Sequence, residues 1–307
     1  PYAPPPPGGA EDIKDEIPEV EDATRLCTFR DCTSTIQVDE DFYEEKLVAF
    51  ADSNFFEIFP IQFLAGDIQS AMYKTQSVVL SERSALRFFD TTDLIGKTIK
   101  INGQDLEIRG VMEDLPESTH FAFEILISTA GQPFNRGPSY TSFSAMTYVR
   151  LNEKSSPEKV EMLIPDLVKK YAAGQIEQGT GVNYEDYIAA GNGYIYTLQP
   201  LKDIHLNSNL QAEMKPNGDI RFIYIFISIA VFILLIASVN FINLATARSA
   251  ERAKEVGVRK AMGSDRGQLI FQFLFEAAIL VLISMAFAIV LASIALPYFN
   301  DLAQKNL

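Results

Sequence analysis

Two kinds of hydrophobic pattern run along this chain, and the longer kind lies in its last third. From residue 222 to residue 247 no side chain is charged, in the run FIYIFISIAVFILLIASVNFINLATA. As a helix at ~1.5 Å per residue these residues measure roughly 39 Å, more than the ~30 Å hydrocarbon core of a bilayer. A second run, 269–299, is broken only by Gln272 and Glu276. The pattern predicts membrane-spanning helices at 221–247 and 268–299.

Shorter patterns fill residues 1–220. Alternating runs rich in β-branched and aromatic residues predict strands. These are two or three strands within 20–52, then strands at 77–80, 97–102, 104–113, 121–129, 144–152 and 194–201, with an extended segment at 203–206. Asn102 and Gly103 predict a tight hairpin turn between two of them.

Helical patterns in the same region begin and end at recognisable residues. A short helix is predicted at 10–17, a helical turn within 53–59, and a helix at 81–90 that Ser81 caps. A longer helix is predicted from Ser156, with Pro157 in its first turn, to Gly174.

Strands and helices mixed in this way predict an α+β extracytoplasmic domain attached to transmembrane helices. The interpretation divides residues 1–220 into two subdomains, a body and a β-rich subdomain inserted at about 74–130. The transmembrane helix 221–247 follows, then a connecting segment at 248–267, the transmembrane helix 268–299 and an end segment at 300–307.

Charge predicts which side of the membrane each segment occupies. The whole chain carries a net charge of -14, but residues 248–266 hold six Lys and Arg against three Asp and Glu. Short loops rich in Lys and Arg stay on the cytoplasmic side. The segment 248–267 is therefore expected in the cytoplasm, and 1–220 and 300–307 outside it.

The first residues, PYAPPPPGG, contain no initiator methionine and no apolar segment that could carry the domain across a membrane. A signal peptide or an earlier membrane helix is therefore expected to precede them, which makes the chain a fragment.

Enzymatic chemistry finds little support in the sequence. The two histidines, His120 and His205, have no Cys, Asp or Glu at metal-ligand spacing, and are expected in a turn and at a surface near the membrane. No GxxxxGK[ST], GxGxxG or GxSxG pattern occurs. The many carboxylates predict a solvated acidic face. No catalytic, cofactor-binding or metal-binding residue and no nucleic-acid partner are therefore expected.

Cys27 and Cys32, in LCTFRDC, allow two readings. They could form a disulfide across a tight hairpin, because an extracytoplasmic location permits the bond. Only some hairpin positions bring the two Cα atoms to about 5.5 Å, so the alternative is a pair of reduced, half-buried residues.

Asn240, Asn243 and Glu276 are polar residues within the predicted spans that call for a partner. Asn240 and Asn243 share one side of the first helix, where amides bond to a neighbouring helix. Glu276 lies about two turns inside the second helix, where a carboxylate needs a partner or a polar cavity. The alternative is that Glu276 reaches back to the interface beside Arg266.

The basic segment itself is expected to be a helix that projects from the bilayer, ends near Gly263 and turns back into the second span. The simpler alternative is a basic loop that only fixes the topology of the chain or attracts anionic lipid. Its residue order goes further: NFINLATARSAERAKEVGVRKAMGSDRGQLIFQFLFEA resembles the R-x-K-E-[VI]-G-[VI]-R-[KR]-A-x-G signature of MacB/FtsX-type ABC transporter permeases. The match runs through Arg252, Lys254, Glu255, Gly257, Arg259, Lys260, Ala261 and Gly263, then Gln272 and Glu276.

The resemblance extends through the outer residues, where IPEVEDATRL, SVVLSERSALRFFDTTDLIGKTIKING, IRGVMEDLPESTHF and LQPLKDIHL are similar to recurring segments of a MacB-like periplasmic core with a porter-like body. The chain departs from the family in having no helix before this domain and none after the second span. The resemblance implies a multi-pass subunit of the bacterial inner membrane with its large domain in the periplasm.

In function, the resemblance implies a non-catalytic permease that couples a separate cytoplasmic ATPase to movement of the periplasmic domain, for export. Arg252, Lys254, Glu255, Gly257, Arg259, Lys260 and Gly263 would form the ATPase-coupling surface. Further implied partners are a second permease copy, membrane lipid, and an outer-membrane channel or periplasmic adaptor. Two alternatives stay open: an FtsX-like regulator of a cell-wall hydrolase, and a membrane-anchored sensor that needs no ATPase.

Overall fold

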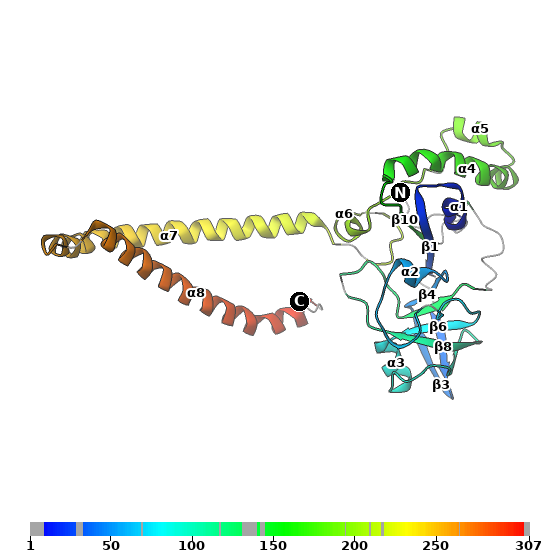
Figure 1. Cartoon of the computed structure of the whole chain (residues 1–307), viewed down its shortest axis with the longest axis horizontal. Helices are drawn as coiled ribbons and strands as arrows, with labels where there is room; N and C mark the ends of the chain where they lie inside the picture. The colour runs from blue at the N-terminus through cyan, green and yellow to red at the C-terminus, as the bar shows by residue number, and fades with distance from the viewer. Residues whose placement is uncertain are drawn as a thin grey trace. The chain divides into compact units, whose positions relative to one another are not determined.

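The computed structural model describes residues 9–28, 33–68, 70–116, 118–130, 140–141, 145–193, 195–208, 210–215, 218–263 and 265–303. The chain divides into two compact units, an outer domain of residues Pro1–Ile220 and a helical hairpin of residues Arg221–Leu307 (Figure 1).

The described part of the outer domain is built on one mixed sheet of ten strands. The strands run in the order β10-β1-β4-β9-β6-β8-β7-β2-β3, and β5 pairs with β8 off this path. They are β1 (Val20–Thr28), β2 (Ser34–Val38), β3 (Asp41–Glu45), β4 (Val48–Ala51), β5 (Phe63–Gly66), β6 (Ser77–Ser81), β7 (Thr98–Ile101), β8 (Gln104–Met112), β9 (Ile125–Ser128) and β10 (Met146–Leu151). Only the pairs β4 with β9 and β6 with β8 are parallel. The predicted α+β class is confirmed.

Strand β6 shows how the sheet separates two hydrophobic clusters. All five of its residues are buried, because β8 and β9 pair with its two edges. Val78 and Leu80 pack into the cluster that includes Phe88 of helix α3 (Glu82–Phe89), whereas Val79 packs into the cluster that includes Phe55 of helix α2 (Phe55–Ile58). Because successive side chains of a strand point to opposite faces of the sheet, β6 contributes to the hydrophobic cluster on each face.

The hairpin between β7 and β8 turns where the sequence predicts. Asn102 and Gly103 have φ angles of 49° and 82°, which is the left-handed region that a type I′ turn requires at both positions. The amide side chain of Asn102 also accepts a hydrogen bond from the backbone N–H of Thr35, at 2.8 Å. The turn therefore fixes the register of β7 against β2 as well as against β8.

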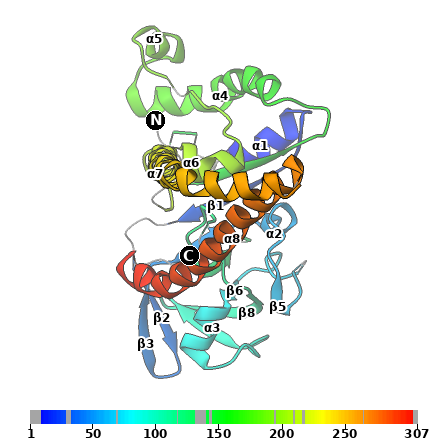
Figure 2. The same ribbon diagram turned by 90° about the vertical axis from the view of Figure 1, so that its left-hand side faces the viewer.

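The helices of the described part of the outer domain are α1 (Gly9–Glu16), α2 (Phe55–Ile58), α3 (Glu82–Phe89), α4 (Pro157–Thr180), α5 (Tyr184–Ala189), the 3-10 helix η2 (Leu201–Asp203) and α6 (Ile204–Asn207). In the outer domain, helices α1, α4 and α5 lie at one end and α3 lies at the opposite end (Figures 1 and 2). The predicted cap of α3 is confirmed, since the hydroxyl of Ser81 accepts a hydrogen bond from the N–H of Ser84 at 3.1 Å. Helices α1 and α4 share a third hydrophobic cluster with β1 and β10.

The predicted end of the long helix is wrong. Helix α4 continues past Gly174 and ends at Thr180, followed by Gly181, whose φ of 73° suits a left-handed cap. A glycine is tolerated inside a helix at a cost of about 1 kcal/mol. Burial of Ile176, two residues further on, favours the longer helix.

The prediction of a last strand at 194–201 and of an extended segment at 203–206 is also wrong. The described residues 195–200 form no regular element, and η2 and α6 follow. Residue 194 lies outside the described part. The N–H of Leu198 donates to the carboxylate of Glu161 on α4, at 2.7 Å, so this segment is bound to a helix side chain instead of a sheet edge.

The strands of the predicted insert, β6 to β9, belong to the same sheet as the strands before them. β9 pairs with β4, and β7 pairs with β2. The three hydrophobic clusters lie on the two faces of the sheet and under α1 and α4. The division at about 74–130 into two subdomains stays a prediction.

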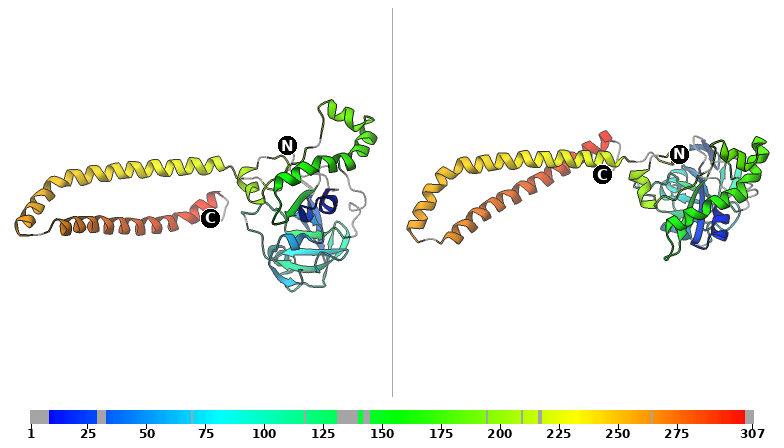
Figure 3. Two further views of the ribbon diagram at one scale, coloured as in Figure 1. Left: turned by 45° about the horizontal axis from the view of Figure 1, so that its top comes forward. Right: turned by 90° about the horizontal axis from the view of Figure 1, so that it is seen from above.

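The helical hairpin consists of α7 (Ile220–Ala261) and α8 (Arg266–Ala303), which run in opposite directions (Figure 3). By length and composition, Ile220–Ser249 and Arg266–Asn300 could each cross a membrane. Helix α7 continues for three further turns beyond the first of these spans, and those turns carry the basic segment.

Candidate functional site

The last turns of α7 hold six of the seven residues predicted for coupling, and the seventh, Gly263, lies in the turn that leads to α8. Helix α7 ends at Ala261, and the N–H groups of Met262 and Gly263 donate to the carbonyl oxygens of Val258 and Lys260, at 3.1 Å each. Gly263 has a φ of 93°, a backbone conformation that is strained for residues with a side chain. The chain then turns into α8, where the carboxylate of Asp265 accepts from the N–H of Gly267 at 3.3 Å.

Two arginines of α7 contact α8. The Arg252 guanidinium donates to the carboxylate of Glu276 at 2.6 Å and lies over the ring of Phe273, with 5.1 Å between its Cζ atom and the ring centroid. Arg259 donates to the amide oxygen of Gln272 at 2.6 Å. Glu276, whose partner the sequence left open, is therefore paired with Arg252.

Glu255 lies on the same side of α7 as Arg259. Their side chains form an ion pair one turn apart, with 2.6 Å between Nη2 and Oε1. Arg259 therefore has a partner on its own helix and a partner on α8, and its two contacts fix the guanidinium in the space between the helices.

The opposite side of this part of α7 is exposed. Lys254, Gly257 and Lys260 lie there, and neither lysine forms an ion pair with a described side chain. Val258 and Met262, which are 56% and 80% exposed, add apolar surface. A shallow concavity of about 460 Å³ lies where the two sides meet, lined by Lys254 and Val258 on one side and by Glu255 and Arg259 on the other. This arrangement offers a positive, partly apolar face to a partner.

The described part of the chain gives no steric reason for a glycine at position 257. A Cβ atom built at Gly257 meets nothing within 4 Å. Because glycine inside a helix costs about 1 kcal/mol relative to alanine, its presence here favours the close approach of something outside the chain.

The amides of Asn240 and Asn243 are exposed on α7, and the structure gives neither a hydrogen bond to a described residue. By contrast, the hydroxyl groups of Ser228, Ser238 and Thr246 on the same helix each donate a hydrogen bond to the carbonyl oxygen of the residue one turn before. An amide of Asn240 or Asn243 that faced lipid would be left without such a partner, so a further helix remains the predicted neighbour.

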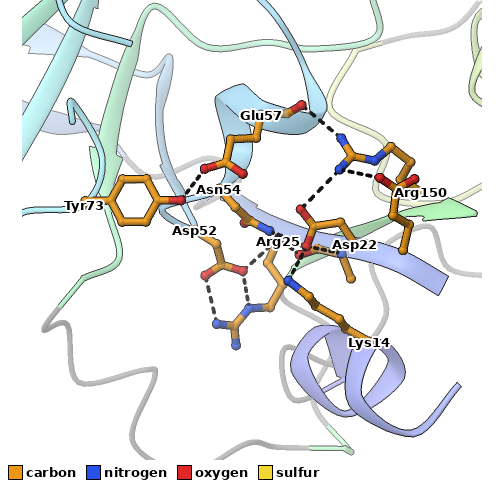
Figure 4. Close-up of polar contacts among 10 residues, drawn as sticks. Lys14, Asp22, Arg25, Asp52, Asn54, Glu57, Tyr73 and Arg150 are labelled. Atoms are coloured by element: carbon orange, nitrogen blue, oxygen red, sulfur yellow. Dashed lines mark hydrogen bonds and ion pairs between the residues drawn. The ribbon is translucent and has the colours of Figure 1, made fainter. Parts of the chain in front are cut away.

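The outer domain contains a buried charged network that the sequence analysis missed (Figure 4). Arg25 of β1, whose side chain is 5% exposed, holds Asp52 through two bonds, Nε to Oδ2 at 2.8 Å and Nη2 to Oδ1 at 2.9 Å. The hydroxyl of Thr129 also donates to Asp52, at 2.9 Å. Burial opposes the charge on Arg25, but hydrogen bonding and attraction to Asp52 raise its pKa.

A second centre of this network is Asp22, also on β1. Its Oδ1 atom accepts from Lys14 of α1 at 2.7 Å and from the amide of Asn54 at 2.9 Å, and Arg150 of β10 lies 3.8 Å from its Oδ2 atom. The network thus joins α1, β1, β10 and the segment after β4. The sequence signal for this network was the presence of charged residues in the strand VEDATRLCT. The structure pairs both edges of that strand with neighbouring strands.

His120 and Cys27 occupy ordinary structural positions in the outer domain. His120 lies 2.9 Å from the hydroxyl of Tyr148, and burial, followed by the nearby charges of Lys215 and His205, lowers its pKa to about 4. Cys27 is buried on β1, and this burial raises its pKa to about 12. Cys32 lies outside the described residues, so the disulfide stays a prediction. No cluster of metal-ligating side chains occurs in the described part of the chain.

Comparisons with known proteins fit both units. The profile of the MacB-like periplasmic core domain family matches residues 1–167, more than half of the chain, and the profile of the FtsX-like permease C-terminal family matches residues 227–307. Among curated relatives, the ABC transporter permease YknZ of Bacillus subtilis is 27% identical over 67% of this chain and 45% of its own length. The macrolide export ATP-binding/permease protein MacB of Haemophilus ducreyi is 27% identical over 78% of this chain and 31% of its own length.

The chain thus spans less than half the length of these two relatives. Among solved structures, a domain described as that of a permease protein from Porphyromonas gingivalis superposes with a TM-score of 0.54 and 25% identity, over 65% of this chain and 80% of that one. Since one profile covers more than half of the chain and the other covers the helical hairpin with its basic segment, the chain belongs to the MacB/FtsX-type ABC transporter permeases.

Proposed function

We propose that this chain is a non-catalytic permease subunit that couples ATP binding and hydrolysis by a separate cytoplasmic ATPase to movement of its outer domain. The observation that carries the proposal is the division of the basic segment into two sides. Arg252 and Arg259 are engaged with α8, whereas Lys254, Gly257 and Lys260 form an exposed face. Such a face suits a partner with acidic and apolar groups.

The charge distribution supports the orientation. The segment 248–266 carries an excess of three positive charges, whereas residues 1–220 hold 18 Lys and Arg against 35 Asp and Glu. By the positive-inside rule, we place the α7–α8 turn in the cytoplasm and the outer domain in the periplasm, with the chain in the inner membrane. Further membrane helices, a second permease copy and surrounding lipid would cover the exposed apolar sides of α7 and α8.

Export is the direction we propose for transport, because the outer domain lies where it would act on a molecule already released to the periplasmic side. The printed name of the Haemophilus ducreyi relative also describes macrolide export. An outer-membrane channel or a periplasmic adaptor would then be a natural partner of the outer domain.

The proposal is tested by purifying the full-length protein from its native membrane and identifying bound proteins by mass spectrometry. We expect an ATPase subunit with the wild type and not with the double variant Lys254→Glu, Lys260→Glu. The matched control, Lys46→Glu with Lys74→Glu, makes the same charge change at exposed lysines of the outer domain and should keep the ATPase. Absence of an ATPase from the wild type and the control alike would overturn the proposal.

A further inference from the structure

The contacts between α7 and α8 follow one consistent register. Arg252 pairs with Glu276 and Arg259 pairs with Gln272, so that residues later in α7 meet residues earlier in α8. Arg252 and Arg259 lie about two turns apart on α7, and Gln272 and Glu276 lie about one turn apart on α8. The two contacts therefore connect α7 and α8 at two successive positions along the helices, both near the turn.

The side chains in these contacts are positioned by more than one neighbour. Phe273 lies under the Arg252 guanidinium while Glu276 accepts its hydrogen bond, and Glu255 holds Arg259 from the opposite side to Gln272. A guanidinium that is held at two points loses less conformational entropy for each added bond than a single ion pair does. Of the two arginines, Arg259 also lines the shallow concavity beside the exposed face, whereas Arg252 does not.

Glu276 lies within the span Arg266–Asn300, well inside α8 from its first residue. A carboxylate at this depth is costly unless it has a partner, and Arg252, three residues beyond the span of α7, supplies one. The pair consequently ties the part of α7 outside its span to the part of α8 inside its span.

From this geometry we propose that Arg252, Arg259, Gln272 and Glu276 form a latch, which transmits a force on the exposed face of α7 to α8. This inference rests on the proposed function. It separates two roles within the basic segment: Lys254, Gly257 and Lys260 meet the ATPase, whereas Arg252 and Arg259 are positioning residues that make the two helices move together. Without the latch, the ATPase would pull on α7 alone.

The test uses the full-length protein with its ATPase and measures docking and response separately. Docking is the amount of ATPase that co-purifies. Response is the change in protease cleavage of the outer domain when ATP is added. The variants are Arg252→Glu, Glu276→Arg and the double charge swap that contains both substitutions.

We expect each single variant to keep the ATPase but to lose about five-fold or more of the ATP-dependent change, the lower end of common coupling between sites. The double swap should restore it, because a latch needs the pair and not a particular residue on each helix. Single variants that respond like the wild type, or a double swap that stays as defective as the single ones, would overturn the latch. Absence of the ATPase from the wild type would instead refute the proposed function.

A second measurement tests the geometry without any ATPase. Cysteines placed at 252 and 276 should be joined by a short bifunctional maleimide in membranes, after the native cysteines have been replaced. The matched pair at 254 and 276 should not be joined, because Lys254 lies on the exposed side of α7. Equal cross-linking of both pairs would contradict the latch even if the proposed function holds.

Discussion

Arg25 and Asp52 face each other inside the outer domain as a two-point ion pair, with the side chains 5% and 14% exposed. The N–H of Arg25 donates to the same carboxylate, at 2.9 Å. Asp52 follows β4 and Arg25 lies on β1, so the pair fixes the position of two neighbouring strands where their ladder ends. The main effect of such a buried ion pair on stability is that removal of one partner is strongly destabilising, because the other charge is left buried without its partner.

We therefore expect Asp52→Asn to lower the free energy of unfolding by about 3–5 kcal/mol, because it leaves the buried Arg25 guanidinium without its counter-charge. Chemical denaturation followed by circular dichroism measures the loss. The matched control is Asp105→Asn, which removes the carboxylate of an exposed pair with Lys100 and should change stability by less than about 1 kcal/mol. Equal losses in the two variants would show that burial does not decide the effect.

Gly257→Ala should separate folding from docking. Its new methyl group meets nothing within 4 Å, so the substitution should stabilise α7 by about 1 kcal/mol. If a partner approaches this face closely, the same methyl group should reduce the amount of ATPase that co-purifies. Gly174→Ala, at an equally open position inside α4, is the control, which should stabilise its helix and leave docking unchanged. Undiminished docking in Gly257→Ala would remove Gly257 from the contact face.

The stability of the outer domain should depend on His120 in acid. Its pKa is about 4 in the folded protein and 6.5 ordinarily, so between these values the unfolded chain binds a proton that the folded chain does not. Stability is therefore lost as pH falls from 6.5 towards 4. Thermal unfolding across this range should show a shallower pH slope in His120→Phe than in the wild type. A slope unchanged in His120→Phe would assign the dependence to other groups.

Cys27 should be inert towards thiol reagents in the folded protein. Burial raises its pKa to about 12, which keeps the thiol protonated, and also blocks access to it. Mass spectrometry after iodoacetamide treatment at pH 8 should find Cys27 unlabelled.

Unfolding without reductant then tests the predicted disulfide. A bond between Cys27 and Cys32 would keep both residues unlabelled until a reductant is added. Immediate labelling of both on unfolding would show that they are free thiols.

Local chemistry explains which parts of the fold the sequence could predict. Ser81 as a helix cap, and Asn102 with Gly103 as a turn, act through bonds to their own neighbours, so their effect can be read from a few residues. The end of α4 could not be read in this way, because a buried Ile176 outweighs an interior Gly174. The segment 195–207 was misread for a similar reason, since its backbone is bound by Glu161 of α4.

The same distinction between local and distant contacts applies to the candidate site. The order of residues in the basic segment was visible in the sequence and led to its interpretation as a coupling surface. Which of them face α8 was not visible, because the pairs Arg252 with Glu276 and Arg259 with Gln272 depend on how two helices meet across the turn. Arg25 and Asp52 were missed for the same reason, being 27 residues apart.

The pairing of the first strand with the last one has a consequence for the time course of folding. Val20 of β1 pairs with Leu151 of β10, and β4 pairs only with the end of β1, from Leu26 to Thr28. Until β10 has been synthesised, most of one edge of β1 lacks its neighbour, and Asp22 lacks Arg150. Such distant pairing slows folding and leaves a strand edge open to other chains. The nascent outer domain should therefore need protection from aggregation until β10 arrives.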